Sequence, residues 1–382
     1  MNILRTIETF YPYVTGPTKQ AFRISRELEL RGFSSPILTT YCDVDRQLPA
    51  REHYRGVSVT RYRNQLRLMR YCISLGMVRG YKDCDLIHSH NYRNFQTDLS
   101  ILVSKVKKKP FVLSTHGALL GYKRYLAGKL ARFPYVLYDA VTFKLAAKKA
   151  DVVVVSSQVE YEDALEFGIV EEKLRLIPAG IDVKDYELPV ERENSEIKLL
   201  FVGRIARNRR LETLVQALKD IDKAVLLTIV GSEEKTSSVS RRGYLEELIA
   251  LAKKLGVEDR VRFVGPRFDD ELVKCYCLAD IFVYPSRYES FGQPLLEAAA
   301  AGLPIISTPV GVARDIVKNG KTGYLIEYNN PTMLAERVTT LSDEYTRNNC
   351  SRAIRELVKN NYAWDDIIEK YIALYQEPML SP

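Results

Sequence analysis

The stretch YESFGQPLLEAAAAGLPIISTPVG, residues 288–311, contains a loop, a helix and a strand in the order that an alternating α/β fold requires. The apolar run IFVYPS (281–286) before it predicts a buried strand. Pro294 stands where a helix begins, because proline suits the first helical turn, and Gly302 ends that helix. The stretch therefore predicts a strand, a loop at its carboxyl end, a helix over 293–301 and a further strand.

The same pattern recurs along the whole chain on both sides of this stretch. Short β-branched runs that are almost continuously apolar predict strands buried on both faces of a parallel sheet. Amphipathic stretches such as 19–31 and 244–255 separate them and predict helices. Alternation of this kind indicates βαβ units and an α/β fold with doubly wound sheets. The other runs are ILTTY (37–41), DLIHSH (85–90), FVLSTH (111–116), DVVVVSS (151–157), KLLFVG (198–203), VLLTIVG (225–231), VRFVG (261–265) and PIISTP (304–309).

A polar segment divides the chain into two such series. The stretch YELPVERENSE (186–196) carries Pro189 and predicts a linker. We expect two Rossmann-like domains that face each other across a cleft, one over 1–186 and one over 196–360. Residues 361–375 predict a final helix that follows the second series without a strand of its own. The cleft at the carboxyl ends of the strands is the expected active site.

Length and composition set the class of protein. The chain has 382 residues, of which 46% are apolar and 27% charged, which excludes a disordered chain, a collagen-like chain and a membrane bundle. The start MNILRTIETFYP lacks the pattern of a signal peptide, so we expect a cytoplasmic protein that begins at Met1. The six cysteines have no zinc-site spacing, and we expect reduced thiols.

Charge is distributed unevenly along the chain. Residues 1–150 hold 26 Lys and Arg and 10 Asp and Glu, a net charge of +16. The rest of the chain holds 30 Lys and Arg and 38 Asp and Glu, a net charge of −8. A strongly basic half favours an anionic partner, such as a phosphorylated substrate, a membrane surface or a nucleic acid.

Several well-known motifs are absent from the sequence. It has no GxGxxG after a strand, no GxxxxGK[ST] and no GxSxG, which argues against a dehydrogenase, a P-loop NTPase and an enzyme with a nucleophile elbow. DxD triplets, which can bind a metal with a nucleotide, occur at 43–45, 83–85 and 220–222. Because one opens a strand and the others lie in polar connections or at a helix end, we expect surface acids.

Two glutamates bracket the loop and helix of the opening stretch. Glu289 lies on the loop, and Glu297 lies one turn into the helix, so both face the same crevice. The backbone N–H groups of Phe291, Gly292 and Gln293 are expected to point the same way. Amides at a helix N-terminus hold a phosphate, and carboxylates accept hydrogen bonds from hydroxyls. The segment therefore predicts a site for a phosphorylated sugar.

This segment resembles the E-x7-E signature of retaining glycosyltransferases of the GT-B type, and specifically of glycosyltransferase family 4. Further segments resemble that family in the same order along almost the whole chain. They are YPYVTGPTKQAFRISRELELRGF (11–33) for the opening glycine loop and first helix, DLIHSHNY (85–92) and VLSTHG (112–117) for strands ending in histidine, IPAGID (177–182) for an IPNGID turn, FVGRIARNRRLETLVQAL (201–218) for a GR-x4-KG segment, and WDDIIEKYIALY (364–375) for the closing helix.

The resemblance implies a GT-B fold in which residues 361–382 pack back on the N-terminal domain. That domain, over 1–186, would bind the acceptor, and the domain over 196–360 would bind a nucleotide-diphosphate sugar. A hexose or N-acetylhexosamine would pass to an acceptor hydroxyl with retention at the anomeric carbon. No pair of carboxylates suggests the double displacement of a glycosidase.

The resemblance also implies roles for individual residues. Arg204 and Arg209 match the basic pair that clamps the donor diphosphate, and their guanidinium groups would stabilise the departing diphosphate in place of a metal. We therefore expect no metal and no cofactor. Glu297 would bind the ribose hydroxyls, and Glu289 would contact the transferred sugar.

Other implied site residues lie on both halves. Gly16 would let the first loop approach the diphosphate, because it has no Cβ. His116 would line the reaction centre near the sugar and completes a catalytic set with Arg204, Arg209 and Glu289. The remaining donor-binding residues are Ser290, Phe291, Gly292 and Gln293, and His88 and His90 are expected in the wall of the cleft.

Four positions depart from the pattern of the family. Arg209 stands where a lysine is usual, and Arg210 stands where the following glycine is usual. Pro17 replaces a second glycine in the first loop, and Asp315 replaces a glutamate. These changes could mark a subfamily with a different donor or acceptor.

Two basic segments point to the acceptor. RYRNQLRLMRYCISL (61–75) and GYKRYLAGKLARFPYVLYDAVTFKLAAKK (121–149) interleave Lys and Arg with apolar residues and predict helices with one basic and one apolar face. Such helices lie on anionic membranes, so we expect association with the inner face of the membrane and a lipid-linked or glycan acceptor. The alternative is a helix whose apolar side faces the core, and a soluble sugar or small-molecule acceptor.

Two other classes of function stay open on the sequence alone. A nucleotide-sugar isomerase of the 2-epimerase kind could share this fold, but it would need acid and base groups beside the sugar. A non-catalytic nucleic-acid binder could use the basic half. Because no RRM, KH or helix-turn-helix signature is present, we expect no nucleic acid partner.

Overall fold

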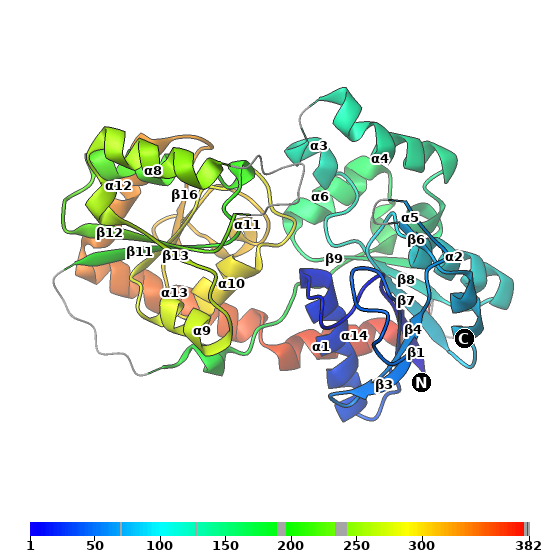
Figure 1. The fold of residues 1–382 in the computed structure, drawn as a ribbon. Helices are drawn as coiled ribbons and strands as arrows, with labels where there is room; N and C mark the ends of the chain where they lie inside the picture. Colours follow the sequence, from blue (N-terminus) through cyan, green and yellow to red (C-terminus); the bar gives the residue numbers. More distant parts are fainter. Residues whose placement is uncertain (69–70, 127, 189–195, 234–242, 378–379, 381–382) are drawn as a thin grey trace.

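The computed structural model describes residues 1–382 except 69–70, 127, 189–195, 234–242, 378–379 and 381–382, and it consists of two α/β halves built on separate sheets (Figure 1). The predicted α/β class with two Rossmann-like units is confirmed. The predicted linker lies mostly within 189–195, outside the described residues.

The N-terminal half is built on an eight-stranded sheet in the order β10-β9-β8-β7-β1-β2-β4-β3. All neighbouring strands are parallel except β3, which pairs antiparallel with β4 at the edge. The central strands are buried along their whole length, as their continuous β-branched runs predict. The strands are β1 (Ile3–Thr6), β2 (Ile37–Thr40), β3 (Arg51–Tyr54), β4 (Val57–Tyr62), β7 (Leu86–His90), β8 (Phe111–Ser114), β9 (Val152–Val155) and β10 (Leu174–Leu176).

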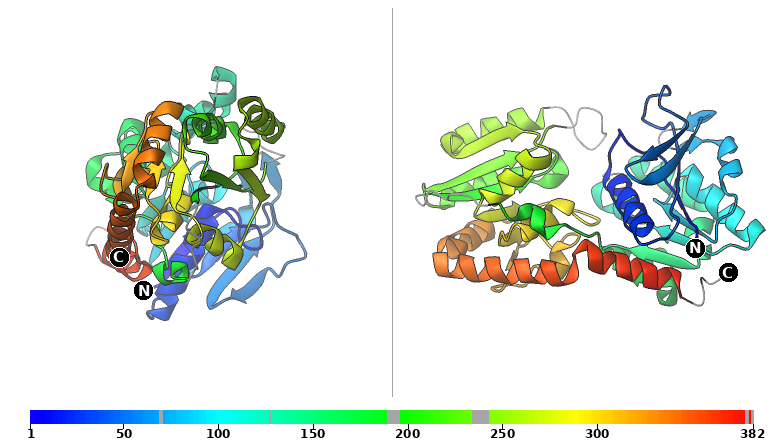
Figure 2. Two further views of the ribbon diagram at one scale, coloured as in Figure 1. Left: turned by 90° about the vertical axis from the view of Figure 1, so that its left-hand side faces the viewer. Right: turned by 90° about the horizontal axis from the view of Figure 1, so that it is seen from below.

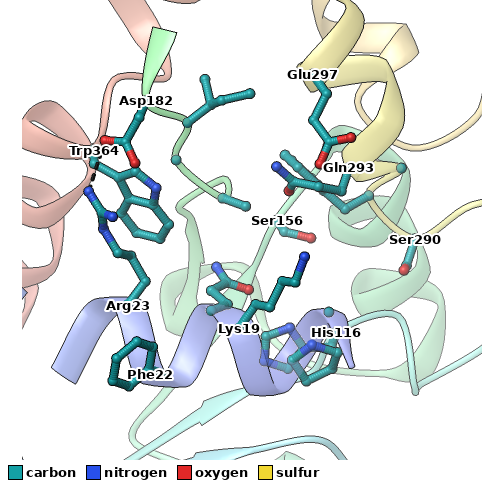
Figure 3. Close-up of a pocket in the computed structure, with 18 of the residues that line it drawn as sticks. Lys19, Phe22, Arg23, His116, Ser156, Asp182, Ser290, Gln293, Glu297 and Trp364 are labelled. Atoms are coloured by element: carbon teal, nitrogen blue, oxygen red, sulfur yellow. Dashed lines mark hydrogen bonds and ion pairs between the residues drawn. The ribbon is translucent and has the colours of Figure 1, made fainter. Parts of the chain in front are cut away.

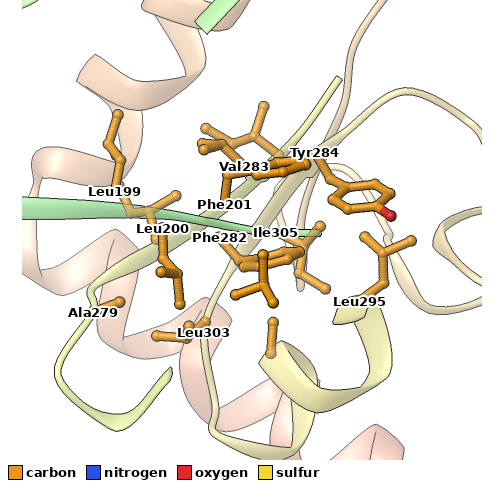
Figure 4. Close-up of a cluster of buried hydrophobic side chains, with 14 of the residues drawn as sticks. Leu199, Leu200, Phe201, Ala279, Phe282, Val283, Tyr284, Leu295, Leu303 and Ile305 are labelled. Atoms are coloured by element: carbon orange, nitrogen blue, oxygen red, sulfur yellow. The ribbon is translucent and has the colours of Figure 1, made fainter. Parts of the chain in front are cut away.

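The C-terminal half is built on a six-stranded parallel sheet in the order β13-β12-β11-β14-β15-β16. Phe201 and Tyr284 stack with their ring centroids 5.4 Å apart, and Leu295 of the following helix packs beside them (Figure 4). This core holds the helix after β14 against the sheet. The strands are β11 (Ile197–Val202), β12 (Val225–Val230), β13 (Val261–Gly265), β14 (Ile281–Tyr284), β15 (Ile305–Ser307) and β16 (Gly323–Leu325).

Helices cover both sheets. Those of the first half are α1 (Gly16–Leu30), α2 (Phe95–Lys107), α3 (Gly121–Tyr125), α4 (Lys129–Val141), α5 (Leu145–Lys149) and α6 (Gln158–Phe167). Those that follow are α7 (Leu211–Ala217), α8 (Tyr244–Leu255), α9 (Asp269–Cys277), α10 (Gln293–Ala300), α11 (Ala313–Ile316), α12 (Pro331–Ser342), α13 (Glu344–Asn361) and α14 (Trp364–Tyr375). Short 3-10 turns are η1 (Leu75–Gly80), η2 (Glu171–Lys173), η3 (Val183–Tyr186), η4 (Arg207–Arg209), η5 (Leu218–Asp220) and η6 (Glu258–Arg260).

The closing helix α14 leaves the second half and packs under the first (Figure 2). Its side chains Ile367, Ile368 and Tyr371 share a buried cluster with Ile3 of β1 and Leu28 of α1. The predicted helix over 361–375 corresponds to α14, which begins at Trp364 rather than at 361 because α13 extends to Asn361. The chain therefore passes from the first half into the second and returns to the first through α14.

One predicted helix is wrong. Residues 61–75 form the end of β4 and a separate antiparallel hairpin of β5 (Leu66–Leu68) and β6 (Tyr71–Ile73). The apolar residues Leu66 and Leu68 alternate with arginine, a period of two that fits a strand better than a helix. The basic segment 121–149, by contrast, is helical as predicted, since it contains α3, α4 and α5.

Candidate active site

A cavity of about 480 Å³ opens between the two halves, and its lining comes from both (Figure 3). It lies where the order of strands reverses, between β11 and β14 in one sheet and between β1 and β7 in the other. Loops that follow parallel strands meet at such a point and form a crevice. The fold therefore places the cavity where the sequence predicts the active site.

Most of the predicted catalytic and donor-binding residues line this cavity, and two of that set do not. Arg204 lies exposed after β11, and Arg209 is buried in the turn η4, so neither belongs to the cavity wall. The predicted residues that line it are Gly16, His116, Glu289, Ser290, Phe291, Gly292, Gln293 and Glu297.

The loop before α10 presents free backbone amides. Gly292 caps the helix in a left-handed conformation with φ +84°, which glycine adopts without strain. In the described part of the chain, the N–H groups of Phe291, Gly292 and Gln293 donate to no carbonyl or side chain. The carbonyl of Phe291 accepts from Val312 at 2.7 Å, and Gly311 permits that approach because a Cβ there would lie 2.2 Å from the same oxygen. The contact with Gly311 and Val312 therefore fixes the conformation of the loop.

Glu297 is the acid that α10 turns toward the cavity. Its neighbours Leu295, Leu296 and Ala298 are buried against the sheet, whereas Glu297 stays partly exposed. Its carboxylate accepts a hydrogen bond of 2.8 Å from the Tyr276 hydroxyl. Burial raises the pKa of Glu297, while the Tyr276 hydrogen bond and the charge of Lys19 act in the opposite direction. The group is a carboxylate with unused acceptor capacity.

Glu289 is held by residues of its own half. Its carboxylate is ion-paired with Arg209, and it accepts a hydrogen bond of 3.0 Å from the Tyr284 hydroxyl. Arg209 in turn donates to the Tyr284 oxygen at 3.0 Å. The next residue, Arg210, has φ +55°, which explains why the family pattern has glycine there. Arg210 is nonetheless anchored, since it ion-pairs with Glu212 at 2.8 Å.

The two halves touch directly at the rim of the cavity. The Ser157 hydroxyl of the first half donates to the Ser290 carbonyl of the second at 2.6 Å. Gly117 has φ +74°, and a Cβ there would lie 2.1 Å from Cβ of Ser290. Asp315, which departs from the family pattern, accepts from the Gln158 backbone N–H at 3.3 Å. These contacts place the loop of Ser290 against the first half.

The three strand-end histidines form one group. His116 lines the cavity, and its Nε2 atom lies 2.9 Å from Nδ1 of His90. Burial lowers the pKa of His116 to about 4, so the ring is neutral near pH 7. His88 and His90 are fully buried and do not line the cavity, so their predicted place in its wall is wrong.

Sequence reasoning missed part of the N-terminal wall. Lys19 and Arg26 of α1 line the cavity together with Arg55, and Trp364 of α14 closes one side (Figure 3). Trp364 packs so closely on the turn 177–182 that a Cβ on Gly180 would lie 2.5 Å from its ring. The basic charge of the first half was the only feature of the sequence that indicated cations such as Lys19, Arg26 and Arg55. No local pattern indicated that Trp364 reaches the cavity.

Two family descriptions match this chain and together cover most of it. Residues 14–185 match Glycosyltransferase Family 4, and residues 185–357 match Glycosyl transferases group 1. The boundary between the matches falls at the start of the predicted linker.

Curated proteins with similar sequences span most of the chain. An uncharacterized glycosyltransferase of Methanocaldococcus jannaschii is 28% identical over 361 residues, which is 87% of each chain. A D-inositol 3-phosphate glycosyltransferase of Corynebacterium jeikeium is 30% identical over 274 residues, 67% of this chain and 64% of its own. Spore coat protein SA of Bacillus subtilis is 26% identical over 364 residues, 89% of this chain and 90% of its own.

Solved structures share the fold. Anabaena HepE in complex with UDP superposes with a TM-score of 0.80 at 20% identity and covers 98% of this chain and 99% of its own. The sucrose-phosphate synthase of Thermosynechococcus elongatus superposes with a TM-score of 0.78 at 23% identity and covers 98% of each chain. The predicted GT-B architecture is confirmed.

Proposed function

The chain belongs to the glycosyltransferases of group 1 and family 4, and from this premise we propose that it moves a hexose or N-acetylhexosamine from a nucleotide-diphosphate sugar to an acceptor hydroxyl with retention. The observation that carries the proposal is the pair Glu289 and Glu297 around three free amides, facing one cavity between the halves. Family membership favours transfer over the isomerase and nucleic-acid alternatives.

In this proposal the donor binds mostly to the C-terminal half. Glu297 accepts hydrogen bonds from the ribose, and the N–H groups of Phe291, Gly292 and Gln293 bind phosphate oxygens, which suits amides at the start of a helix. The solved relative HepE has UDP and UDP-glucose complexes, which supports a nucleotide-sugar donor.

The reaction breaks the bond from the anomeric carbon to the diphosphate and forms one from that carbon to the acceptor oxygen. The acceptor proton leaves with the diphosphate oxygens. Arg204 and Arg209 would offset the charge that develops on the leaving group, because each guanidinium offers a fork of donors. Arg209 can do so only if it exchanges part of its contact with Glu289 for the phosphate. We propose that no metal is needed.

The acceptor in this proposal binds to the N-terminal wall and is anionic. Lys19, Arg26 and Arg55 line that wall, and no carboxylate of the described residues forms an ion pair with any of them. The ring of Phe22 lies there as well, beside Arg23 (Figure 3). Cations beside an aromatic surface suit a phosphate-linked sugar or lipid head group.

The helix α4 supports acceptor recruitment from a membrane. Its apolar side chains point outward, with Leu130 88% exposed, Phe133 57% and Val141 68%. The same region is rich in Lys and Arg, since α3, α4 and α5 carry Lys123, Arg124, Lys129, Arg132, Lys148 and Lys149. An exposed apolar helix in a segment rich in basic residues suits an anionic bilayer. The described part of the chain has no helix long and apolar enough to cross a membrane.

The test of the proposed function is release of the nucleoside diphosphate from a panel of UDP and GDP sugars, with and without EDTA. We expect one donor to be hydrolysed or transferred, activity to survive EDTA, and Glu297→Ala to abolish it. Glu258→Ala, an exposed acid outside the cavity, is the matched control. Loss of the signal with EDTA would overturn the metal-independent mechanism, and equal activity of both variants would overturn the assigned site.

A further inference from the structure

Arg5 of β1 is a fully buried cation without a carboxylate partner in the described part of the chain. Its Nε atom donates to the Ser35 hydroxyl at 3.1 Å, and Nη2 donates to the Tyr375 hydroxyl at 2.7 Å. Its Nη1 atom lies 3.0 Å from Nδ1 of His88 and 3.1 Å from Nε2 of His90. A buried charge without a counter-ion is costly, so this arrangement calls for a reason.

The chemistry of Arg5 decides which ring nitrogens carry protons. A guanidinium group only donates hydrogen bonds, so Nδ1 of His88 and Nε2 of His90 must accept. A neutral imidazole has one acceptor and one donor nitrogen, so the proton of His90 is on Nδ1. The proton of His88 is on Nε2, which lies 2.8 Å from the Ser114 hydroxyl. A protonated His90 would turn a second donor toward Arg5, so both rings are neutral.

The same reasoning extends one ring further. Nδ1–H of His90 points to Nε2 of His116 at 2.9 Å, so that atom accepts and the remaining proton of His116 is on Nδ1. The rings form a continuous stack, with centroids 4.6 Å apart for His88 and His90 and 5.2 Å apart for His90 and His116. Burial lowers the pKa of all three histidines, in agreement with neutral rings. Among the described residues, nothing accepts from Nδ1 of His116.

We propose that Arg5 and His90 are positioning residues, which hold His116 in the Nδ1–H form so that it donates a hydrogen bond into the cavity and cannot act as a base. The recipient is an oxygen of the transferred sugar, and this identification rests on the proposed function. Tyr375 of α14 completes the group, because its hydroxyl accepts from Arg5 and lies 2.8 Å from Nδ1 of His88. The closing helix α14 thus helps to hold Arg5 and His88 in place behind the active site.

The tautomers can be measured without any substrate. The chain has four histidines, so long-range proton–nitrogen correlation spectra of protein labelled with ¹⁵N-histidine can be assigned by single substitutions of His53, His88, His90 and His116. We expect His90 and His116 with protons on Nδ1 and His88 with its proton on Nε2. A His116 that is protonated on Nε2, or is cationic near pH 7, would overturn the proposal. Because no turnover is involved, this outcome is separate from a failure of the proposed transfer.

Two substitutions of His90 separate positioning from packing. His90→Asn keeps an N–H donor near the place of Nδ1, and His90→Phe keeps the ring but removes the donor. We expect His90→Asn to retain the Nδ1–H form of His116 and His90→Phe to lose it, with a fall in kcat of about tenfold or more for the latter. The Tm reports folding in both variants, and affinity for UDP and GDP reports donor binding. An unchanged His116 tautomer in folded His90→Phe protein would contradict the proposed positioning of His116 by His90.

Discussion

The guanidinium of Arg209 is ion-paired with the carboxylate of Glu289, so a residue assigned to the donor diphosphate contacts one assigned to the transferred sugar. Both side chains are largely buried, at 9% and 15% exposure. The pair links the turn after β11 with the loop after β14, which are the two sides of the crevice. It therefore affects both the shape and the charge of the proposed donor site.

This pair gives a prediction for stability. Glu289→Leu removes the carboxylate that is ion-paired with a buried guanidinium and should cost about 3 kcal/mol, whereas Arg209→Met with Glu289→Leu should recover part of that loss. A double-mutant cycle by urea unfolding measures the coupling. The exposed pair Arg207 and Glu247 is the control, with an expected coupling below about 1 kcal/mol. Equal coupling in the two cycles would show that the pair is not structurally important.

The environment of Glu297 predicts a pH dependence of nucleotide binding. Burial raises the pKa of this acid, so its carboxylate is protonated at a higher pH than an exposed glutamate, and affinity for the nucleoside diphosphate of the donor should fall as pH falls through that pKa. Tyr276→Phe removes a hydrogen bond that favours the carboxylate, so the fall should begin at higher pH. Calorimetric titration with UDP and GDP at a series of pH values measures the shift. Tyr345→Phe, at an exposed position, should match the unmodified chain, and a Tyr276→Phe profile that also matches would refute the assignment.

The contact of Gly117 with Ser290 predicts that closure of the halves affects donor binding. Gly117→Ala adds a Cβ that would lie 2.1 Å from Cβ of Ser290 and must push the loop away, so the donor KM should rise about tenfold or more. Gly32→Ala is the matched control, because Gly32 also has positive φ but open space around it. The control should cost about 1 kcal/mol of stability and leave the KM unchanged. A similar KM for both variants would argue against closure at this contact.

The outward face of α4 predicts binding to anionic vesicles. Leu130→Glu with Phe133→Glu should weaken co-sedimentation with phosphatidylglycerol-containing vesicles by about tenfold or more, and higher salt should weaken binding of the unmodified chain. Phe268→Glu, an exposed apolar residue of the second half, should have no effect. If the unmodified chain does not bind at moderate salt, the acceptor is not recruited through this face.

Much of the fold could be predicted from local sequence. Continuous apolar runs predicted the buried strands because a strand covered on both faces admits few polar side chains, and Pro294 with Gly302 marked the ends of α10 closely. The strand pair of β5 and β6 was missed because the alternation of Leu66 and Leu68 around Arg67 is a weak signal in a strand of only three residues. Boundaries between α13 and α14 depend on packing rather than on composition.

The candidate site was predicted where one segment carries it and missed where distant segments meet. Glu289 and Glu297 lie on one loop and helix, so their spacing alone indicates a shared direction. Trp364 of α14 lines the cavity, and Arg5 of β1 contacts His90 behind it; these two elements are joined only by the tertiary fold. A buried arginine beside His90 has no signature in the sequence, since His88 and His90 lie 83 and 85 positions away and Tyr375 lies 370 positions away.

The return of α14 to the first sheet has a consequence for how the protein is made. The core beneath β1 needs Ile367, Ile368 and Tyr371, and these residues are synthesised after the whole second half. The N-terminal half leaves the ribosome first and therefore has an exposed apolar surface until α14 is synthesised. The C-terminal half has most of its own core within 197–358. The half that is synthesised first is thus the half whose core is completed last. The helix α14, which covers the apolar surface of the first half, also brings Tyr375 to the histidine stack.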